Sequence, residues 1–389
     1  MIPRSITKNI ARLKDKFPII ALTGPRQSGK TTLLQHLFAD YTYVSLENPE
    51  VRSFAERDPN GFLNTYPNRA IFDEVQRAPS LFSYLQTKVD KDRIMGQYIL
   101  SGSQQFGLME KISQSLAGRV VLFRLLPFSF EELDLTPKGL SLDANEVMLM
   151  GGYPAIYDRQ IDSADYYPSY IETYIERDVR TLINVKDLAL FRTFLRLCAG
   201  RIGQVLNMQS FASDTGITVQ TAKSWLTVLE TSFILFTLQP YYKNFNKRVT
   251  KSPKLFFYDT GVACNLLGIR SAEQLANYYQ KGSIFENMVI AELYKQGFNT
   301  GVTHPFFFWR DSNGLEVDLL IEKLEGLDVI EMKSGSTIHS ELLKGVNQFS
   351  SIAGDAIHKK YLIYGGSEIQ RRTDATVLGW RNISTGLDI

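Results

Sequence analysis

The sequence predicts a multidomain α/β protein. The chain has 389 residues, enough for two to four domains of roughly 100–200 residues each. A strand, a glycine-rich loop and a helix follow one another near the N-terminus, which is typical of an open parallel sheet. A helix-turn-helix spacing and a second group of strands come later. With 44% hydrophobic and 22% charged residues, the composition excludes a wholly disordered chain.

Charge and cysteine usage narrow the class of protein. The formal net charge is only +2, so global charge does not indicate a nucleic-acid binder, although a local basic patch still could. Cys198 and Cys264 are far apart in apolar settings and predict no disulfide framework, which suits a cytoplasmic protein. Charges interrupt the N-terminus, so we expect no secretory signal. The longest apolar runs are far shorter than about 20 residues, so we expect no membrane association.

A phosphate-binding pattern, G-x-x-x-x-G-K-[ST], occupies the first strand–helix junction. The preceding FPIIALT (17–23) predicts a buried parallel strand, and TTLLQHLFA predicts a helix. Backbone N–H groups of such a loop face phosphate oxygens, whereas a purely structural turn is the alternative. Lys30 would contact the β- and γ-phosphates, and Thr31 would hold Mg²⁺. The expected ATP-binding residues are Gly24, Pro25, Arg26, Gln27, Ser28, Gly29, Lys30, Thr31 and Thr32.

Two carboxylates and two hydroxyls follow later strands of the predicted sheet. Asp73 and Glu74 end a short apolar strand, 70–72. We expect Asp73 to hold the Mg²⁺ water shell and Glu74 to orient or activate the attacking water. Ser101 and Ser103 end a third strand, where Ser103 could sense the γ-phosphate. The alternatives are a surface cap for the carboxylates and ordinary turn chemistry for the serines.

Phosphoryl transfer usually also needs an arginine that neutralises charge. We expect Arg119 to fill this role from a neighbouring subunit of a homo-oligomer, with Arg26 as a second candidate. An ordinary surface ion pair explains either arginine equally well.

Five segments together resemble a prokaryotic family of AAA-type ATPases that carry a C-terminal domain of unknown function. They are GPRQSGKTTLL, IFDEVQRAPS, ILSGSQQ, SLAGRVVLFRLLPFSFEEL and GGYPAIY. The resemblance implies an ASCE-type P-loop ATPase core at 1–135, a helical lid at 136–187, a winged helix at 188–262 and a restriction-endonuclease-like domain at 280–389. From the phosphate-binding pattern and the carboxylates we expect ATP and Mg²⁺ as cofactors, and we also expect a homo-oligomer such as a hexameric ring.

The middle of the chain has helix-turn-helix spacing, with a turn at Gly216 and a second helix from about Val219 to Glu230. Two strands should follow, separated by a loop with basic and aromatic residues but no acid. This pattern favours contact with nucleic-acid phosphates; a winged helix that only binds protein is the alternative. The expected DNA-binding residues are Thr221, Lys223, Lys243, Lys247, Arg248 and Lys251, with Lys254 in the same loop.

A second charged constellation occupies the last third. Glu331 and Lys333 are two residues apart on a predicted strand and share one face. With Asp318 from the adjacent strand and Glu286 from a helix, the carboxylates could hold one or two Mg²⁺, with Asp318 and Glu331 as ligands. Lys333 could then position water for phosphodiester hydrolysis.

The pattern D…E-x-K resembles the PD-(D/E)xK nuclease superfamily, especially the branch related to archaeal Holliday-junction resolvases. Asp318, Glu331 and Lys333 match its motif and Glu286 matches its helical acid, while Gln348 could match a helical glutamine found in some branches; Val317 stands where the motif has proline. An active nuclease, an inactive DNA-binding module and an internal Glu–Lys ion pair are the three alternatives.

These features predict an ATP-hydrolysing enzyme coupled to DNA binding and processing, including metal-dependent cleavage or remodelling of branched DNA. The alternative is a nucleotide-dependent switch whose C-terminal regions bind a protein partner, or bind DNA without cutting it.

Overall fold

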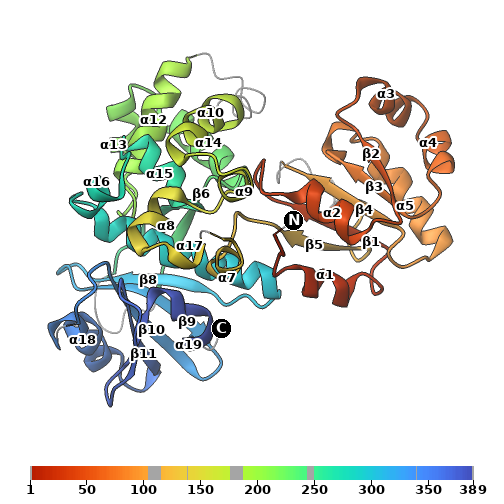
Figure 1. Cartoon of the computed structure of the whole chain (residues 1–389). Helices are drawn as coiled ribbons and strands as arrows, with labels where there is room; N and C mark the ends of the chain where they lie inside the picture. Colours follow the sequence, from red (N-terminus) through yellow and green to blue (C-terminus); the bar gives the residue numbers. More distant parts are fainter. Residues whose placement is uncertain are drawn as a thin grey trace.

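The molecule has two lobes, each built around one β-sheet. The computed structural model describes residues 2–103, 115–137, 139–175, 187–242, 249–338 and 340–387. The first lobe holds a five-stranded sheet and the second an eight-stranded sheet. Figure 1 shows the N-terminal lobe on one side and the middle and C-terminal thirds together on the other. Among the described helices, none is long and apolar enough to cross a membrane.

The first sheet is parallel throughout and has the order β2-β3-β4-β1-β5. β4 therefore lies between the strand that precedes the phosphate loop and the strand that ends in Asp73. The strands are β1 (Ile19–Thr23), β2 (Thr42–Ser45), β3 (Ala70–Asp73), β4 (Tyr98–Gly102) and β5 (Val120–Arg124).

Helices cover both faces of this sheet, so its central strands β1, β3 and β4 are buried along their whole length rather than on alternate residues. Ile19 and Ala21 of β1 pack in one hydrophobic cluster, and Ile20 and Leu22 pack in another on the opposite face. The helices are α1 (Thr7–Leu13), α2 (Lys30–Leu37), α3 (Pro49–Arg57), α4 (Pro59–Thr65) and α5 (Leu81–Asp92), with the 3₁₀ turn η1 (Val75–Arg77) after β3.

Short helices connect the two lobes, in the region where the resemblance implies a helical lid. The first begins with a capping box in which Ser129 and Glu132 satisfy each other's backbone N–H groups. The last continues into a π-helical turn, η3 (Ile171–Ile175), a feature frequent at functional sites. The helices are α7 (Phe130–Asp134), α8 (Ala144–Met150), α9 (Pro154–Asp158) and α10 (Ser163–Tyr170), with η2 (Gly139–Ser141).

The predicted helix-turn-helix and hairpin are present. α13 (Met208–Thr215) ends at Gly216, whose φ of 77° is left-handed, and Thr218 caps α14 (Val219–Thr231). α12 (Leu188–Gly200) precedes them, and β6 (Leu235–Pro240) and β7 (Lys254–Phe257) form the antiparallel hairpin.

This hairpin is not a free wing, because β6 also pairs in parallel with β8. The second sheet has the order β12-β13-β11-β10-β9-β8-β6-β7. One hydrophobic cluster runs from Phe128 to Leu387. The predicted division between 188–262 and 280–389 therefore does not separate two cores; both regions share one sheet and one core.

The remaining elements complete this lobe. α17 (Lys281–Thr300) is a 20-residue helix that packs against β10, and α18 (Lys344–Ala353) packs against β9 and β10. The strands are β8 (Phe306–Arg310), β9 (Glu316–Lys323), β10 (Gly326–Lys333), β11 (Ile357–Tyr364), β12 (Ile369–Arg371) and β13 (Thr376–Gly379). The short helices are α15 (Thr260–Leu266), α16 (Ala272–Ala276) and α19 (Ile383–Gly386).

Candidate active site

Two glycines fix the loop between β1 and α2. Gly24 has a φ of 151°, and a Cβ placed on it would lie 2.1 Å from the carbonyl oxygen of Leu125. Gly29 has a φ of 93° and is the N-cap of α2. No other residue fits either position without strain, so the pattern's two glycines are explained by backbone geometry.

Lys30 begins α2, and only 6% of it is exposed. Its ammonium donates hydrogen bonds to the carbonyl oxygens of Gly24 and Pro25, at 2.9 and 2.8 Å. The side chain therefore curls over the loop instead of extending into solvent, and it lines the cavity described below.

Asp73 accepts hydrogen bonds from three hydroxyl groups. Thr31 donates over 3.0 Å and Tyr43 over 2.7 Å, and Ser101 donates to the other carboxylate oxygen. Tyr43 was missed by sequence reasoning, since its approach depends on β2 pairing beside β3. Partial burial and the neighbouring carboxylate of Asp73 raise the pKa of Tyr43, so its hydroxyl stays protonated as a donor.

A hydroxyl and a carboxylate at hydrogen-bond distance are the hard oxygen ligands that Mg²⁺ prefers. Thr31 and Asp73 thus fit the group predicted from the sequence, on the grounds of their 3.0 Å contact at the edge of the cavity.

Glu74 is held by its neighbours. Its φ of 55° is left-handed, which is uncommon for a residue with a side chain. The carboxylate accepts from Gln76 Nε2 at 2.5 Å and from Ser103 Oγ at 3.2 Å. Ser103, predicted as a γ-phosphate sensor, therefore lies beside the carboxylate predicted to activate water.

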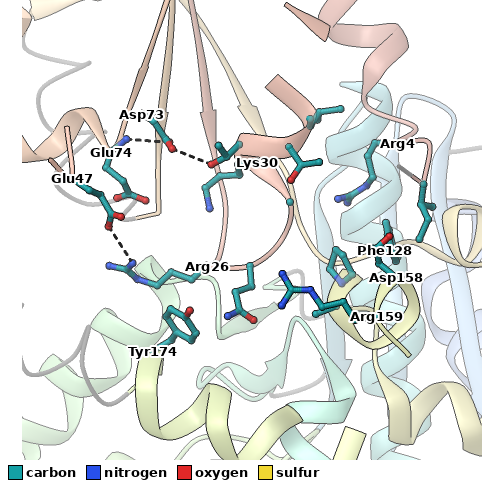
Figure 2. A pocket seen from close by; sticks show the side chains of 18 residues that line it. Arg4, Arg26, Lys30, Glu47, Asp73, Glu74, Phe128, Asp158, Arg159 and Tyr174 are labelled. Atoms are coloured by element: carbon teal, nitrogen blue, oxygen red, sulfur yellow. Dashed lines mark hydrogen bonds and ion pairs between the residues drawn. The ribbon is translucent and has the colours of Figure 1, made fainter. Parts of the chain in front are cut away.

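A cavity of about 630 Å³ opens between the phosphate loop and the second lobe. At one end are Lys30, Asp73 and Glu74; at the other, Phe128 and Arg159 (Figure 2). This volume is typical of small-molecule sites. Residues from the second lobe complete its wall, namely Pro154, Ala155, Asp158, Arg159 and Tyr174.

Tyrosines of α10 and η3 contact the loop from the second lobe. The Tyr166 hydroxyl donates to Gln27 Oε1 at 2.8 Å, and the Arg26 guanidinium lies 5.8 Å from the ring centre of Tyr174. Gln27 has a φ of 60°, so this contact supports a residue in an unfavourable backbone conformation.

Arg4 is a buried residue of this region that the sequence did not indicate. Its guanidinium donates to the carbonyl oxygens of Ser28 (2.7 Å) and Leu126 (2.6 Å) and pairs with Glu132 at 3.1 Å. It therefore joins the phosphate loop to the segment that enters the second lobe. The sequence gives no signal for this role, because Glu132 lies 128 positions later in the chain and meets Arg4 only in the folded protein.

The two candidate arginines lie in different places. Arg26 lines the cavity, with Glu47 4.0 Å away. Arg119 precedes β5 and so lies at the opposite end of the strands from the phosphate loop. It makes two hydrogen bonds of 2.6 and 2.7 Å to Asp90. Within one chain Arg119 is thus part of a surface ion pair, and its action on a neighbouring subunit stays a prediction.

The predicted DNA-binding residues are partly described. Lys223 and Lys251 are exposed, and Thr221 is half-buried next to Thr218; Lys243, Lys247 and Arg248 lie outside the described residues. Lys254 corrects the sequence interpretation. Only 1% of it is exposed, because β7 carries it beneath α17 and β9.

The structure brings the C-terminal constellation together. Lys333 pairs with Glu331 at 2.5 Å, as expected for one strand face, and Asp318 accepts from the Met332 amide at 2.8 Å. Glu286 instead pairs with Lys254 at 2.9 Å. Sequence reasoning assigned Lys254 to the basic loop instead of to this cluster, and it missed Glu316, which lies 2.5 Å from Lys254. Gln348 is exposed on α18.

Burial dominates the electrostatics of this cluster. It raises the pKa of Glu286 to about 8 and that of Glu331 to about 7, and it also raises the pKa of Asp318. Within the described ranges, no group of three or more His, Cys, Asp or Glu side chains is arranged to hold a metal ion. Metal binding by Asp318 and Glu331 therefore stays a prediction.

Family models match three consecutive parts of the chain: an AAA domain at 16–134, a domain of unknown function (DUF8612) at 141–273 and another (DUF4143) at 281–383. The first supports a nucleotide-dependent ATPase. Among solved structures, the Walker-type ATPase PABY2304 of Pyrococcus abyssi is similar, with 16% identity and a TM-score of 0.46, over 68% of this chain and 96% of that one.

Two curated relatives are more similar in sequence. They are the uncharacterized proteins Rv2008c of Mycobacterium tuberculosis and Mb2031c of Mycobacterium bovis, each 30% identical over 323 residues, which is 82% of this chain and 71% of the relative. In this chain a match to an AAA domain precedes matches to two domains of unknown function. The chain belongs to the family of these two mycobacterial proteins.

Proposed function

We propose that the protein hydrolyses ATP in the cavity between the phosphate loop and the second lobe. The observation that carries this proposal is the convergence of Lys30, Thr31, Asp73 and Glu74 on one cavity. These are the cation, the hydroxyl and the two carboxylates that phosphoryl transfer to water requires.

Each side chain has a distinct task in this proposal. Lys30 exchanges its contacts with the loop carbonyls for the β- and γ-phosphates, since both are acceptors for its ammonium. Thr31 and Asp73 hold Mg²⁺, which neutralises phosphate charge when bound. Glu74 orients the attacking water, while Gln76 and Ser103 fix its carboxylate.

The opposite end of the cavity suits the base and the ribose. Phe128, Pro154 and Ile2 provide apolar surface there, and Asp158 and Arg159 provide polar groups. Since α9 belongs to the second lobe, bound nucleotide contacts both lobes. We infer that its binding and hydrolysis change how the lobes are held together.

Two substitutions test this proposal by separating binding from turnover. Lys30→Ala should abolish tight binding of a fluorescent ATP analogue, because the phosphates lose their main cation. Glu74→Gln should keep that binding and lower phosphate release by about 100-fold or more. Glu50→Gln, on the exposed side of α3, is the matched control. Normal turnover in Glu74→Gln contradicts the role given to this carboxylate.

DNA binding and remodelling is the second candidate function, in which ATP hydrolysis acts on DNA held by the second lobe. It is favoured by the helix-turn-helix with exposed Lys223 and by the meeting of Asp318, Glu331 and Lys333. We expect ATPase activity to rise with four-way DNA at low salt, where phosphate contacts are strongest. If the protein shows no binding to single-stranded, duplex, forked or four-way DNA and no stimulation by them, the result favours the alternative, a nucleotide-dependent switch with a protein partner.

A further inference from the structure

The charged cluster of the second lobe is made by the hairpin strand β7 and by three other elements, α17, β9 and β10. β9 contributes Glu316 and Asp318, β10 contributes Glu331 and Lys333, α17 contributes Glu286, and β7 contributes Lys254. Four carboxylates thus face two ammonium groups. Such a group is costly to bury unless each charge finds a partner.

Lys254 is the most enclosed member of the cluster. Its side chain is 1% exposed, and its ammonium lies 2.9 Å from Glu286 Oε1 and 2.5 Å from Glu316 Oε1. Asp318 also attracts it. The position is fixed by the backbone, because Lys254 pairs with Leu238 of β6 and forms a bridge with Val205.

The carboxylates therefore already have donors. Lys254 forms ion pairs with Glu286 and Glu316, and Lys333 forms one with Glu331 at 2.5 Å. The Met332 amide donates a hydrogen bond of 2.8 Å to Asp318. Mg²⁺ requires near-octahedral oxygen ligands and keeps much of its water. The Lys254 ammonium, in contact with Glu286 and Glu316 and attracted by Asp318, already neutralises this side of the cluster and would repel a divalent ion placed there. The residues present thus do not fit the metal that the nuclease resemblance implies.

We propose that the ammonium of Lys254 takes the place of a divalent cation in this cluster. The cluster is a lysine-filled charge site that fastens the hairpin to α17 and β9, and it takes up no Mg²⁺ or Mn²⁺. The second lobe then holds DNA or a partner without metal-dependent cleavage. This inference does not depend on ATP hydrolysis in the first lobe.

Manganese titration of the full-length protein without nucleotide tests the proposal. Asp73→Asn is built into every protein, so that the phosphate-loop site takes up no Mn²⁺. In this background the melting temperature should not change with millimolar Mn²⁺. Adding Lys254→Ala should lower it by about 5–10 °C, because buried carboxylates lose their counter-ion, and Mn²⁺ should restore most of that loss. Lys251→Ala, an exposed lysine three residues away, should have neither effect.

A second variant keeps the test decisive if Lys254→Ala does not fold without metal. Glu286→Gln combined with Lys254→Ala removes one charge of each sign and should fold without Mn²⁺. Recovery by Mn²⁺ or by this second substitution supports the proposal; failure of both overturns it. It is also overturned if the protein with native Lys254 is stabilised by Mn²⁺ and Glu331→Gln abolishes that stabilisation.

Discussion

Arg4 donates a hydrogen bond of 2.7 Å to the carbonyl oxygen of Ser28, which places a residue from the start of the chain against the phosphate loop. The same guanidinium pairs with Glu132 at 3.1 Å, and both side chains are buried. Three segments that are distant in sequence therefore share one charged contact at the junction of the lobes.

Removing Arg4 should destabilise the protein through Glu132. Arg4→Met leaves a buried carboxylate without its partner, which typically costs about 3–5 kcal/mol. Arg4→Met with Glu132→Gln should recover most of this loss, since glutamine can still complete the capping box. Urea unfolding of the wild type, both single variants and the double variant measures the effect. Equal destabilisation of Arg4→Met and the double variant would show that the charge pair is unimportant.

Tyr43→Phe tests how Asp73 is oriented. The substitution removes one of the hydroxyl donors to this carboxylate, and a hydrogen bond of this kind is worth about 1 kcal/mol. We expect the Mg²⁺ concentration for half-maximal ATP turnover to rise about fivefold, with little change in maximal turnover. Tyr41→Phe is the control, because the Tyr41 hydroxyl bonds to the Gly96 carbonyl instead. An unchanged Mg²⁺ dependence would contradict the role of Tyr43.

Arg119→Ala distinguishes a surface ion pair from an arginine that acts on a neighbouring subunit. If neighbours use Arg119, turnover should fall about 10³-fold or more, and only at protein concentrations where subunits associate. Asp90→Ala breaks the same ion pair and should remain active. Turnover is measured over a range of protein concentrations, and light scattering gives the oligomeric state at each concentration. Full activity of Arg119→Ala at every concentration restricts this residue to its pair with Asp90.

Glu292 should make stability depend on pH. Burial raises the pKa of Glu292 from 4.5 to about 7. Between pH 4.5 and pH 7 the folded protein therefore keeps a proton on this carboxyl that the unfolded chain has already lost. The free energy of unfolding therefore falls as pH rises from about 4.5 to 7 and then levels off, by about 3 kcal/mol for this group.

Glu292→Gln should remove this part of the pH dependence. Denaturant unfolding at pH 5 and pH 8 compares the variant with the wild type and with Glu341→Gln, which is exposed on η4 (Ser340–Leu343). If Glu292→Gln retains the full difference between the two pH values, the slope comes from other groups, among them Glu286.

The nucleotide site was predictable because its signals are local. Gly24, Gly29 and Lys30 follow a strand and begin a helix within a few positions, and Asp73 ends another apolar strand. Parallel strands end at the same edge, so the carboxylate and the loop had to meet. Tyr43 and Arg4 were not predictable, since their contacts depend on strand order and on packing between lobes.

Lys254 shows most clearly where sequence reasoning stops. In sequence it follows a basic loop and resembles its exposed neighbours, such as Lys251. Its burial depends on β6 lying beside β8, where Gln239 pairs with Phe307. No local pattern encodes a pairing between strands so far apart, and the basic, aromatic loop before Lys254 suggested contact with DNA instead.

That parallel pairing also limits how the molecule can work as a machine. A winged helix on a tether could search for its target independently, but here the hairpin is a structural member of the C-terminal sheet. If bound nucleotide moves α9, we expect the helix-turn-helix, the hairpin and the terminal sheet to turn together, because one sheet and one core join them. The longest displacements are then expected far from the phosphate loop, near α18 (Figure 1).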